Sequence, residues 1–369
     1  MRPQLRAELE LLLRGTREPL CIDTAQWDRV LRLARMTGLH GRLAAANEGN
    51  HSVPEPVRRH LVSASRIAAF NARMLLGELD ALASVLRDAA FPVIALKGGA
   101  YALQGGRMAN GRFASDVDLL VPNAHLRPVE QRLRAAGWVA APLDAYDERY
   151  YRDWSHETPP MRFPGRVLEL DLHHAITPVT GTLGFDARPL FDASVPVPGS
   201  AFRVLSPEDQ VLHACVHCFH DGDLALRVRE IVDIDALLRC FLRREGFAER
   251  LVARAGQLGL RRPLWYGLRF AGAWLGTPTA QGMLERIGSP GAISRRLMEW
   301  SAPHAMLPSD PDFPPPTAVR LARTAMLARY HRLRMPLPML VPHLARKTAL
   351  RMRARLLRPA EEPSRKGQP

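Results

Sequence analysis

A short apolar run that ends at a lysine and two glycines places the strongest constraint on how this chain folds. Residues 91–96 are apolar and have the length of a buried strand, and Lys97, Gly98 and Gly99 follow them directly. Residues 100–103 then resume a pattern compatible with a helix. The sequence therefore predicts a strand, a tight turn and the first turn of a helix in immediate succession.

The turn also has the properties of a phosphate-binding site. Lys97 is the only lysine among the first 346 residues of a chain that otherwise uses arginine. Gly98 and Gly99 would lie at a helix N-terminus, where unpaired backbone N–H groups and the helix dipole favour an anion. Glycine also lets the backbone approach a phosphate closely. We therefore expect this turn to hold a phosphate group.

A pair of aspartates on a second strand follows the turn. Residues 115–121 alternate and then become apolar, which predicts a strand whose Asp116 and Asp118 project from one face. Two carboxylates side by side repel each other unless a cation lies between them. Hard oxygen ligands suit Mg²⁺, which keeps several waters and shares its remaining positions with substrate phosphates. The pair therefore predicts a magnesium site.

A third carboxylate is expected on a neighbouring strand, and residues 167–173 supply it. Glu169 and Asp171 share one face of this predicted strand. We favour Asp171, because it lies deeper in the run and is followed by His173 on the same face. Glu169 is interpreted as a surface residue where the strand begins.

These patterns resemble the bacterial nucleotidyltransferase family protein group of the DNA polymerase beta-like superfamily. The similarity covers about residues 65–240 and continues through His213-x-x-x-His217. Two features depart from the superfamily pattern: Gly98-Gly99 replaces the usual Gly-Ser, and the gap to Asp116 is longer than in compact members. The motifs that carry the resemblance are Leu96-Lys97-Gly98-Gly99-Ala100, Arg112-x-x-Ser115-Asp116-Val117-Asp118-Leu119-Leu120-Val121 and Leu170-Asp171-Leu172-His173.

The resemblance implies an α+β fold with a polymerase-beta-like nucleotidyltransferase core, a small mixed sheet with flanking helices. Helical regions would precede and follow this core. It also implies a two-metal mechanism in which Asp116 and Asp118 hold two Mg²⁺ ions and Asp171 completes the second site. Asp171 would also serve as general base for the acceptor hydroxyl, because it is the carboxylate nearest the attacking oxygen.

The same resemblance assigns nucleotide-binding roles to residues around the turn. Lys97 would neutralise phosphate charge, with Arg112 as a second clamp. The backbone N–H groups of Gly98 and Gly99 would orient the phosphates, and Ser115 completes the nucleotide-binding set.

Helical periodicity and breaks in the pattern divide the chain into five parts. Apolar spacing predicts helices before and after the core, and Ser206 is expected to cap the first helix of the second helical region. The expected parts are 1–87, an N-terminal helical region; 88–185, the nucleotidyltransferase core; 186–205, a connector; 206–300, a helical domain; and 301–369, a basic helical tail whose end is disordered from about Pro359.

Length and composition agree with a multi-part cytoplasmic protein. A chain of 369 residues with 47% hydrophobic content can bury a sizeable core. No apolar run reaches the ~18 residues that a membrane span needs, and no secretory signal opens the chain. The cysteines, which are Cys21, Cys215, Cys218 and Cys240, are too few and too clustered for a disulfide framework.

Residues 213–220 contain three histidines and two cysteines, and their spacing argues against zinc. On a helix the histidines share a face, whereas the cysteines lack a second pair downstream. By the resemblance, His213 or His217 would instead face the active-site cleft. Asp233 and Asp235 are interpreted as helix-surface ion pairs rather than cleft residues.

Most of the net charge lies in the tail. Residues 318–369 contain 11 arginines, 2 lysines and 2 glutamates, so the first 317 residues carry only +3 of the chain's +14. Residues 344–357 alternate arginine with apolar residues, which predicts a basic amphipathic helix. Over residues 318–358 this surface suits nucleic acid, an anionic membrane surface or an acidic protein. The alternative is a C-terminal helix that packs on the body with its arginines in solvent.

Two functions follow from these patterns. The first is a Mg²⁺-dependent transferase that moves a nucleoside monophosphate from a nucleoside triphosphate to a hydroxyl group on a small molecule, peptide, protein or RNA. The second is a catalytically silent nucleotide-binding scaffold with a basic C-terminal interaction arm. Intact Lys97, Asp116 and Asp118 favour the transferase, because a decayed site would tolerate their loss.

Overall fold

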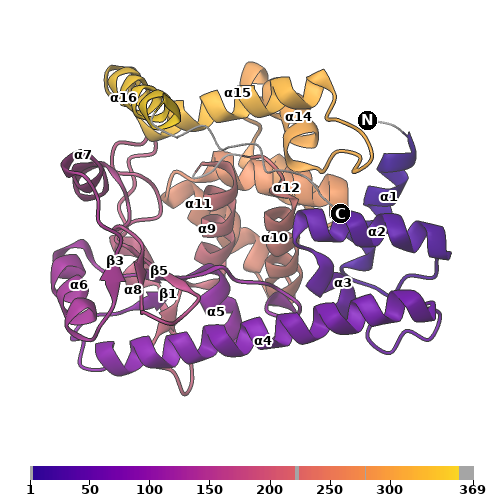
Figure 1. The fold of residues 1–369 in the computed structure, drawn as a ribbon, viewed down its shortest axis with the longest axis horizontal. Coiled ribbons are helices and arrows are strands. Elements are labelled where there is room, and N and C mark those ends of the chain that lie inside the picture. The colour runs from indigo at the N-terminus through magenta and orange to yellow at the C-terminus, as the bar shows by residue number, and fades with distance from the viewer. Residues whose placement is uncertain (1–2, 221–223, 279, 357–369) are drawn as a thin grey trace, which may run out of the picture.

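The computed structural model describes residues 3–220, 224–278 and 280–356, and these form an α+β fold around one mixed sheet (Figure 1). The order of the strands in this sheet is β3-β4-β5-β2-β1-β7-β6. The prediction of a mixed sheet with flanking helices is therefore confirmed. The strands are β1 (Ile94–Ala95), β2 (Asp116–Leu120), β3 (Val139–Ala140), β4 (Met161–Arg162), β5 (Glu169–His173), β6 (Val195–Pro196) and β7 (Arg203–Val204).

Four helices precede the sheet. They are α1 (Pro3–Gly15), α2 (Thr24–Thr37), α3 (His40–Ala46) and α4 (Glu55–Leu86). The boundaries of α2 follow from its sequence. Asp23 and Gln26 form a capping box at its start, and Gly38 ends it in the left-handed conformation at φ 69°.

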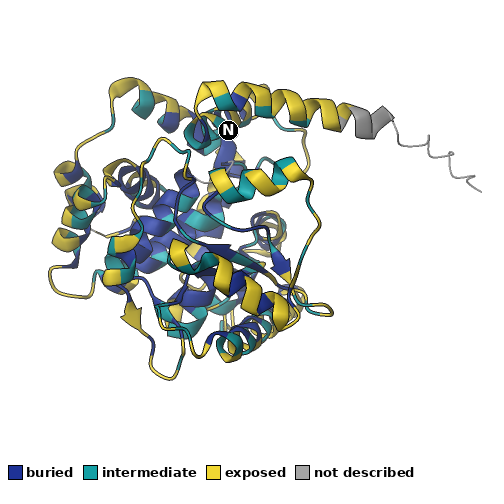
Figure 2. Cartoon of the chain, turned by 90° about the vertical axis from the view of Figure 1, so that its left-hand side faces the viewer, coloured by how far each residue is buried: buried dark blue, intermediate teal, exposed yellow. Residues whose placement is uncertain are grey.

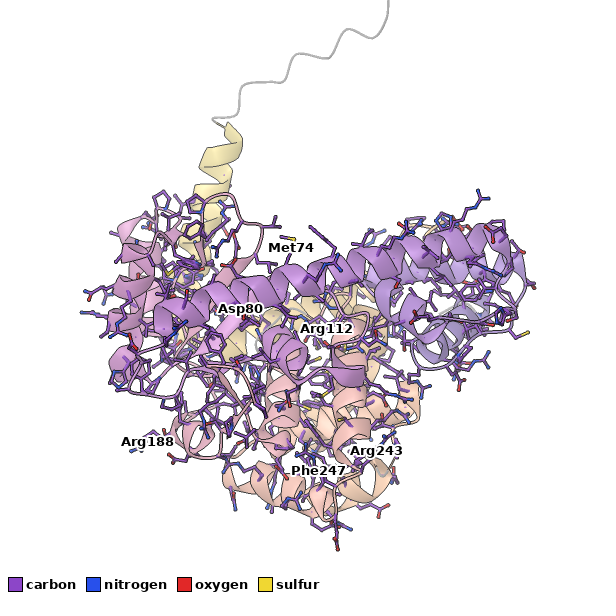
Figure 3. The ribbon with its side chains drawn as sticks, turned by 90° about the horizontal axis from the view of Figure 1, so that it is seen from below. Met74, Asp80, Arg112, Arg188, Arg243 and Phe247 are labelled. Atoms are coloured by element: carbon purple, nitrogen blue, oxygen red, sulfur yellow. The ribbon has the colours of Figure 1, made fainter. Side chains whose placement is uncertain are left out.

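The long helix α4 joins two hydrophobic cores. Early in the helix, Leu61 packs into a core shared with α1–α3 and with the helices that follow the sheet. Later, Leu75, Leu79 and Leu82 pack into a second core with β2, β5 and α6. Figure 3 shows α4 crossing the molecule, with the labelled Asp80 along its length. This helix therefore fixes the sheet against the helical parts of the chain.

The predicted strand, turn and helix around Lys97 are present. β1 is followed by Leu96, which is the N-cap of α5, and α5 begins at Lys97. β1 pairs antiparallel with β2, and β2 pairs parallel with β5. The helices of this part are α5 (Lys97–Gln104), η1 (Gly106–Met108), η2 (Asn123–His125), α6 (Leu126–Ala135), α7 (Ala145–Arg149), η3 (Tyr150–Trp154) and α8 (Arg188–Asp192).

The segment expected to be a connector, residues 186–205, includes α8 and two strands. β7 pairs parallel with β1, and β6 pairs antiparallel with β7, so this segment extends the sheet on the side away from β5.

A second group of helices follows the sheet. Ser206 caps α9 as predicted, because its hydroxyl accepts a hydrogen bond from the Asp209 N–H. α9, α10 and α12 share the first hydrophobic core with α1–α3. These helices are α9 (Pro207–Phe219), α10 (Val228–Phe241), α11 (Phe247–Gln257), α12 (Arg261–Leu275), α13 (Ala280–Ile287), α14 (Ala292–Met306), α15 (Thr317–Arg334) and α16 (Leu337–Leu356).

The basic tail forms α15 and α16, and α16 extends beyond the body with a mostly exposed surface (Figure 2). Near its middle, α16 pairs with the acidic segment around α7: Lys347 binds Asp147 at 2.7 Å and Arg346 binds Asp144 at 3.1 Å. Part of the tail therefore packs on the body, as in the alternative stated above. The end expected to be disordered, from about Pro359, lies outside the described residues.

Across the described residues, none of the helices combines the length and the apolar character needed to cross a membrane.

Candidate active site

The candidate site lies where the first turn of α5 meets the middle of β2. Lys97 has a left-handed backbone, φ 42°, which is uncommon for a residue with a side chain. Its ammonium lies 2.6 Å from Asp118 Oδ1. A strained backbone at a charged residue is typical of functional sites, because the surrounding structure must hold it in place.

Asp118 accepts hydrogen bonds from two neighbouring side chains. Besides Lys97, His173 Nε2 on β5 lies 3.0 Å from the same carboxylate oxygen. The side chain of Asp118 is 2% exposed. Burial alone would raise its pKa, but the positive charge of Lys97 and the hydrogen bond from His173 outweigh this effect and hold the pKa well below its usual range. Asp118 is therefore a buried carboxylate anion.

Asp171 lies directly beside Asp118. The parallel pairing of β2 with β5 places these two residues opposite each other and Asp116 opposite Glu169. Burial raises the pKa of Asp171, and the negative charges of Asp118, Glu157 and Asp116 raise it further, to about 8. The site thus contains more negative charge than its own cations neutralise, which is the condition that a metal ion relieves.

Two groups of side chains in this region have the spacing of metal ligands. One group is Asp118, Asp171 and His173, and the other is His156, Glu157 and His173; within each group the ligand atoms lie within 4.8 Å of one another. Sequence reasoning missed His156 and Glu157. Glu157 reaches the site through an isolated bridge to His173, outside any regular strand, so no periodic pattern marked it.

Asp116 and Ser115 lie at the edge of the site. Asp116 is partly buried at the first position of β2, and Ser115 before it is exposed. Neither belongs to the metal-ligand groups, but both line a small open pocket of about 60 Å³ together with Lys97 and Arg112. The structure therefore brings Asp118 and Asp171 together, with Asp116 at the entrance.

The two glycines of the turn differ in their surroundings. A Cβ added to Gly98 would lie 2.7 Å from Arg112 Nη1 and 3.1 Å from Ala114 Cβ, so the Arg112 side chain would have to move to admit it. A Cβ added to Gly99 would make ordinary contacts at 3.7 Å with Leu79 and Ala95. The close approach of Arg112 thus explains the glycine at position 98, and sterics do not require the second glycine.

Arg112 has a protein partner. Its Nε donates to Asp233 Oδ2 at 2.9 Å, its guanidinium lies over the ring of Tyr101, and Arg42 binds the other oxygen of Asp233 at 2.6 Å. Asp233 is 5% exposed. The interpretation of Asp233 as a helix-surface ion pair is therefore wrong, because its partners come from elements far away in the sequence.

Asp235 does pair with Arg239 four residues later, but it too is buried.

Two histidines of α9 also approach the site. His217 lines the same pocket as Lys97, and its Nδ1 lies 3.3 Å from Glu230 Oε2. Burial and the positive charge of Lys97 lower the pKa of His213 well below its usual range, so His213 is neutral. The expectation that one of these histidines faces the cleft is confirmed for His217.

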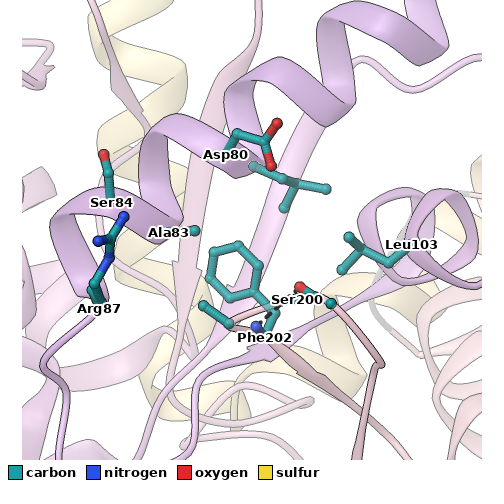
Figure 4. A pocket seen from close by; sticks show the side chains of 10 residues that line it. Asp80, Ala83, Ser84, Arg87, Leu103, Ser200 and Phe202 are labelled. Carbon is teal, nitrogen blue, oxygen red and sulfur yellow. Dashed lines mark hydrogen bonds between the residues drawn. The ribbon is translucent and has the colours of Figure 1, made fainter.

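A separate hollow lies between α4 and the turn before β7 (Figure 4). Asp80 and Ser84 of α4 and its C-cap Arg87 line one side, and Ser200 and Phe202 line the other. None of the predicted site residues lines this hollow, so it is not part of the candidate site.

Comparison with known protein families places the chain among transferases of phosphorus-containing groups. Residues 23–276 match the family described as "Uncharacterised nucleotidyltransferase", and the chain belongs to this family. The match includes Lys97, Asp116, Asp118 and Asp171, whereas α13–α16 lie beyond it. The resemblance inferred from the sequence motifs is therefore confirmed.

Among solved structures, the crystal structure of JHP933 from Helicobacter pylori is similar, at 12% sequence identity and a TM-score of 0.31. The alignment covers 72% of this chain and 96% of that chain. No curated protein matches the chain.

Proposed function

We propose that the site at Lys97, Asp118 and Asp171 transfers a nucleoside monophosphate from a nucleoside triphosphate to a hydroxyl acceptor, with Mg²⁺. The observation that carries this proposal is the arrangement of the charges. Two adjacent carboxylates, Asp118 and Asp171, lie next to a lysine at the first turn of a helix. Membership of a nucleotidyltransferase family supports the reaction class.

Within the α+β fold, we propose that the sheet and its flanking helices form a polymerase-beta-like core. Its support is the chain order strand, helix, strand through β1, α5 and β2, followed by the parallel strand β5. In this arrangement the acidic residues lie on two neighbouring strands and the phosphate-binding turn lies at the end of a third.

The donor set fits a divalent metal. Asp118 and Asp171 would hold Mg²⁺, with Asp116 as a further ligand at the entrance and His173 beside them. The pKa of Asp171, raised to about 8 by burial and by the surrounding carboxylates, is the observation that supports this fit. Bound Mg²⁺ would neutralise triphosphate charge and lower the pKa of the acceptor hydroxyl.

The turn would hold the triphosphate. The first backbone N–H groups of α5, at Gly98 and Gly99, are among those that a helix leaves without internal partners. The Lys97 ammonium is partly exposed and lines the pocket, so it can contact a phosphate as well as Asp118. Ser115 and Arg112 line the same pocket and would contribute a hydroxyl and a second cation.

Asp171 would receive the proton of the acceptor. Its raised pKa makes it a stronger base than an ordinary aspartate. As the acceptor oxygen bonds to the α-phosphorus, the bond to the bridging oxygen breaks, pyrophosphate leaves and the hydroxyl proton passes to the Asp171 carboxylate. A bound cation would favour the ionised form of Asp171 before this step, against the opposing effect of the negative nucleotide.

Thermal unfolding with each nucleoside triphosphate, with and without Mg²⁺, tests the proposal. We expect a Mg²⁺-dependent rise in Tm with at least one nucleotide, and its loss in the Asp116→Asn/Asp118→Asn variant. Glu169→Gln is the matched control, because Glu169 pairs with Asp116 across the sheet but is exposed and belongs to neither metal-ligand group. Equal loss in the control, or no shift in the folded wild type, would refute the assignment.

The second candidate is a catalytically silent nucleotide-binding scaffold with a basic interaction arm. The observation that favours it is the ion pair between Lys97 and Asp118, which already neutralises one carboxylate of the site. A scaffold of this kind would bind nucleotide without Mg²⁺ and form no pyrophosphate. Nucleotide affinity with and without Mg²⁺ and the release of pyrophosphate, measured on the same preparation, separate the two functions.

A further inference from the structure

A second open pocket, lined by arginines, lies between the N-terminal helices and α10. The end of α1, the helix α3, the segment after η1 and the outer side of α10 surround it. Two carboxylates, Glu18 and Asp235, also line it, so the lining residues carry an excess of three positive charges. Its arginines are Arg17, Arg42, Arg107, Arg239 and Arg243.

The described residues do not neutralise three of these arginines. The guanidinium groups of Arg17, Arg107 and Arg243 make neither a hydrogen bond nor an ion pair within the described part of the chain. Burial lowers the pKa of Arg17, and the neighbouring Arg239 lowers it further against the opposing effect of Asp235. Repelling cations gathered around one hollow are the electrostatic condition that a bound anion relieves.

Arg42 adds a buried donor to the same pocket. Its residue exposure is 6%, and its two terminal nitrogens bind Asp233 and the carbonyl oxygens of Arg107 and Met108. Its Nε is buried and has no hydrogen-bond partner in the described structure. A buried N–H without a partner is costly, so Arg42 is held at this position against a local energetic penalty.

The pocket is held in shape by a close backbone contact. Gly111, at φ +69°, packs against α3 so tightly that a Cβ on it would lie 2.3 Å from the carbonyl oxygen of Gly41. The segment before Gly111 supplies Arg107 and Asn110 to the arginine pocket, and the segment after it supplies Arg112 to the pocket at Lys97. The long gap between the glycine turn and Asp116 therefore builds the walls of two pockets.

We propose that the arginine pocket is a second binding site, which takes a multiply charged phosphate-bearing ligand. Arginine forks match phosphate oxygens in pairs, and an excess of three positive charges suits several phosphate charges rather than one carboxylate. The site is distinct from the pocket at Lys97, and the buried ion pairs of Asp233 with Arg42 and Arg112 lie between the two. This inference does not depend on the proposed transferase activity.

Binding of inorganic tripolyphosphate to the full chain in the absence of divalent ions, measured by calorimetry, tests the site. We expect Arg17→Gln/Arg243→Gln to weaken binding by about tenfold or more, because two charge-assisted contacts are lost. Arg127→Gln/Arg132→Gln is the matched control. It removes the same charge from exposed positions on α6 and should leave the affinity within about twofold. Lys97→Gln removes a cation of the other pocket, and the part of the binding that depends on Arg17 and Arg243 should persist in it.

A short single-stranded RNA used as a second probe identifies the source of the phosphate. Tripolyphosphate binding that depends on Arg17 and Arg243 assigns the pocket to a small phosphorylated ligand. Dependence seen only with RNA assigns it to a nucleic-acid backbone, which is the same phosphate chemistry from a polymer. The proposal would be overturned if Lys97→Gln abolished binding while Arg17→Gln/Arg243→Gln preserved it. It would also be overturned if neither tripolyphosphate nor RNA bound the protein.

Discussion

Asp118 and Asp171 lie opposite each other on the parallel strands β2 and β5, and within the described residues the Lys97 ammonium forms its ion pair with the first of them. Lys97 and His173 stabilise Asp118 as an anion, whereas burial and the nearby carboxylates raise the pKa of Asp171 to about 8. The two carboxyl groups therefore have different protonation states near neutral pH, although they lie on neighbouring strands.

Replacing Asp171 by asparagine is expected to stabilise the fold. An acid whose pKa is higher in the folded state than in the unfolded state binds more protons when folded, so stability falls as pH rises from about 4 towards 8. Asp171→Asn removes this penalty, and we expect the free energy of unfolding to rise by at least about 1 kcal/mol at pH 8. Chemical denaturation of the wild type and the variant at pH 5 and pH 8 measures this difference in stability. A variant that is no more stable than the wild type at pH 8 would contradict the charge assignment.

The same pKa predicts how Mg²⁺ affinity depends on pH. A metal ion competes with a proton for Asp171, so affinity should rise with pH and level off above about 8. Calorimetric titration of Mg²⁺ with a nucleoside triphosphate between pH 6 and pH 9 measures this dependence. Asp171→Asn should flatten the profile, and a wild-type affinity that is independent of pH would remove Asp171 from the metal site.

The two glycines of the turn should respond differently to alanine. Gly98→Ala forces a Cβ against Arg112 and Ala114, and overpacking of this kind costs about 1–3 kcal/mol. Gly99→Ala makes ordinary contacts and gains up to about 1 kcal/mol of helix propensity, so it should be neutral or slightly stabilising. Thermal unfolding of both variants tests the difference. If nucleotide affinity falls in Gly99→Ala without loss of stability, the ligand itself needs the second glycine.

Asp233 is expected to contribute strongly to stability. Asp233→Ala would leave Arg42 and Arg112 as buried cations without their shared partner, and removing one member of a buried ion pair costs about 3–5 kcal/mol. Asp28→Ala on the exposed side of α2 provides a control that should change stability by less than about 0.5 kcal/mol. Similar urea midpoints for the two variants would show that the triad is not a stabilising element.

Much of the candidate site could be predicted because local patterns encode it. The strand and turn around Lys97 are specified within a few residues, and alternation placed Asp118 and Asp171 on strands. Pairing in one sheet then brought these two side chains together. The family resemblance set the chemistry, and the match over residues 23–276 confirmed the family.

The features that sequence reasoning missed depend on contacts between distant segments. Glu157 belongs to no strand and reaches His173 through a single bridge. Asp233 has neighbouring arginines in its own helix, so it was interpreted as a surface ion pair, but its partners Arg42 and Arg112 lie on other elements. β6 and β7 have two residues each, which is too short for periodicity to reveal.

The contact between the tail and the body should depend on charge. Lys347 of α16 binds Asp147 of α7, and Tyr146 beside it stacks on His343. Lys347→Glu replaces an attraction with a repulsion. A pair that is only partly buried contributes about 0.2–1 kcal/mol, so we expect Tm to stay nearly unchanged while α16 and α7 lose protection from hydrogen exchange.

The reversed pair Lys347→Glu/Asp147→Lys should restore that protection, because it rebuilds the ion pair with opposite polarity. Raising the salt concentration should weaken protection in the wild type and in the reversed pair alike. If Lys347→Glu leaves exchange in α7 unchanged, the aromatic contact with His343 holds the tail without help from the charges. Restored protection would establish that the tail docks on the body through charge.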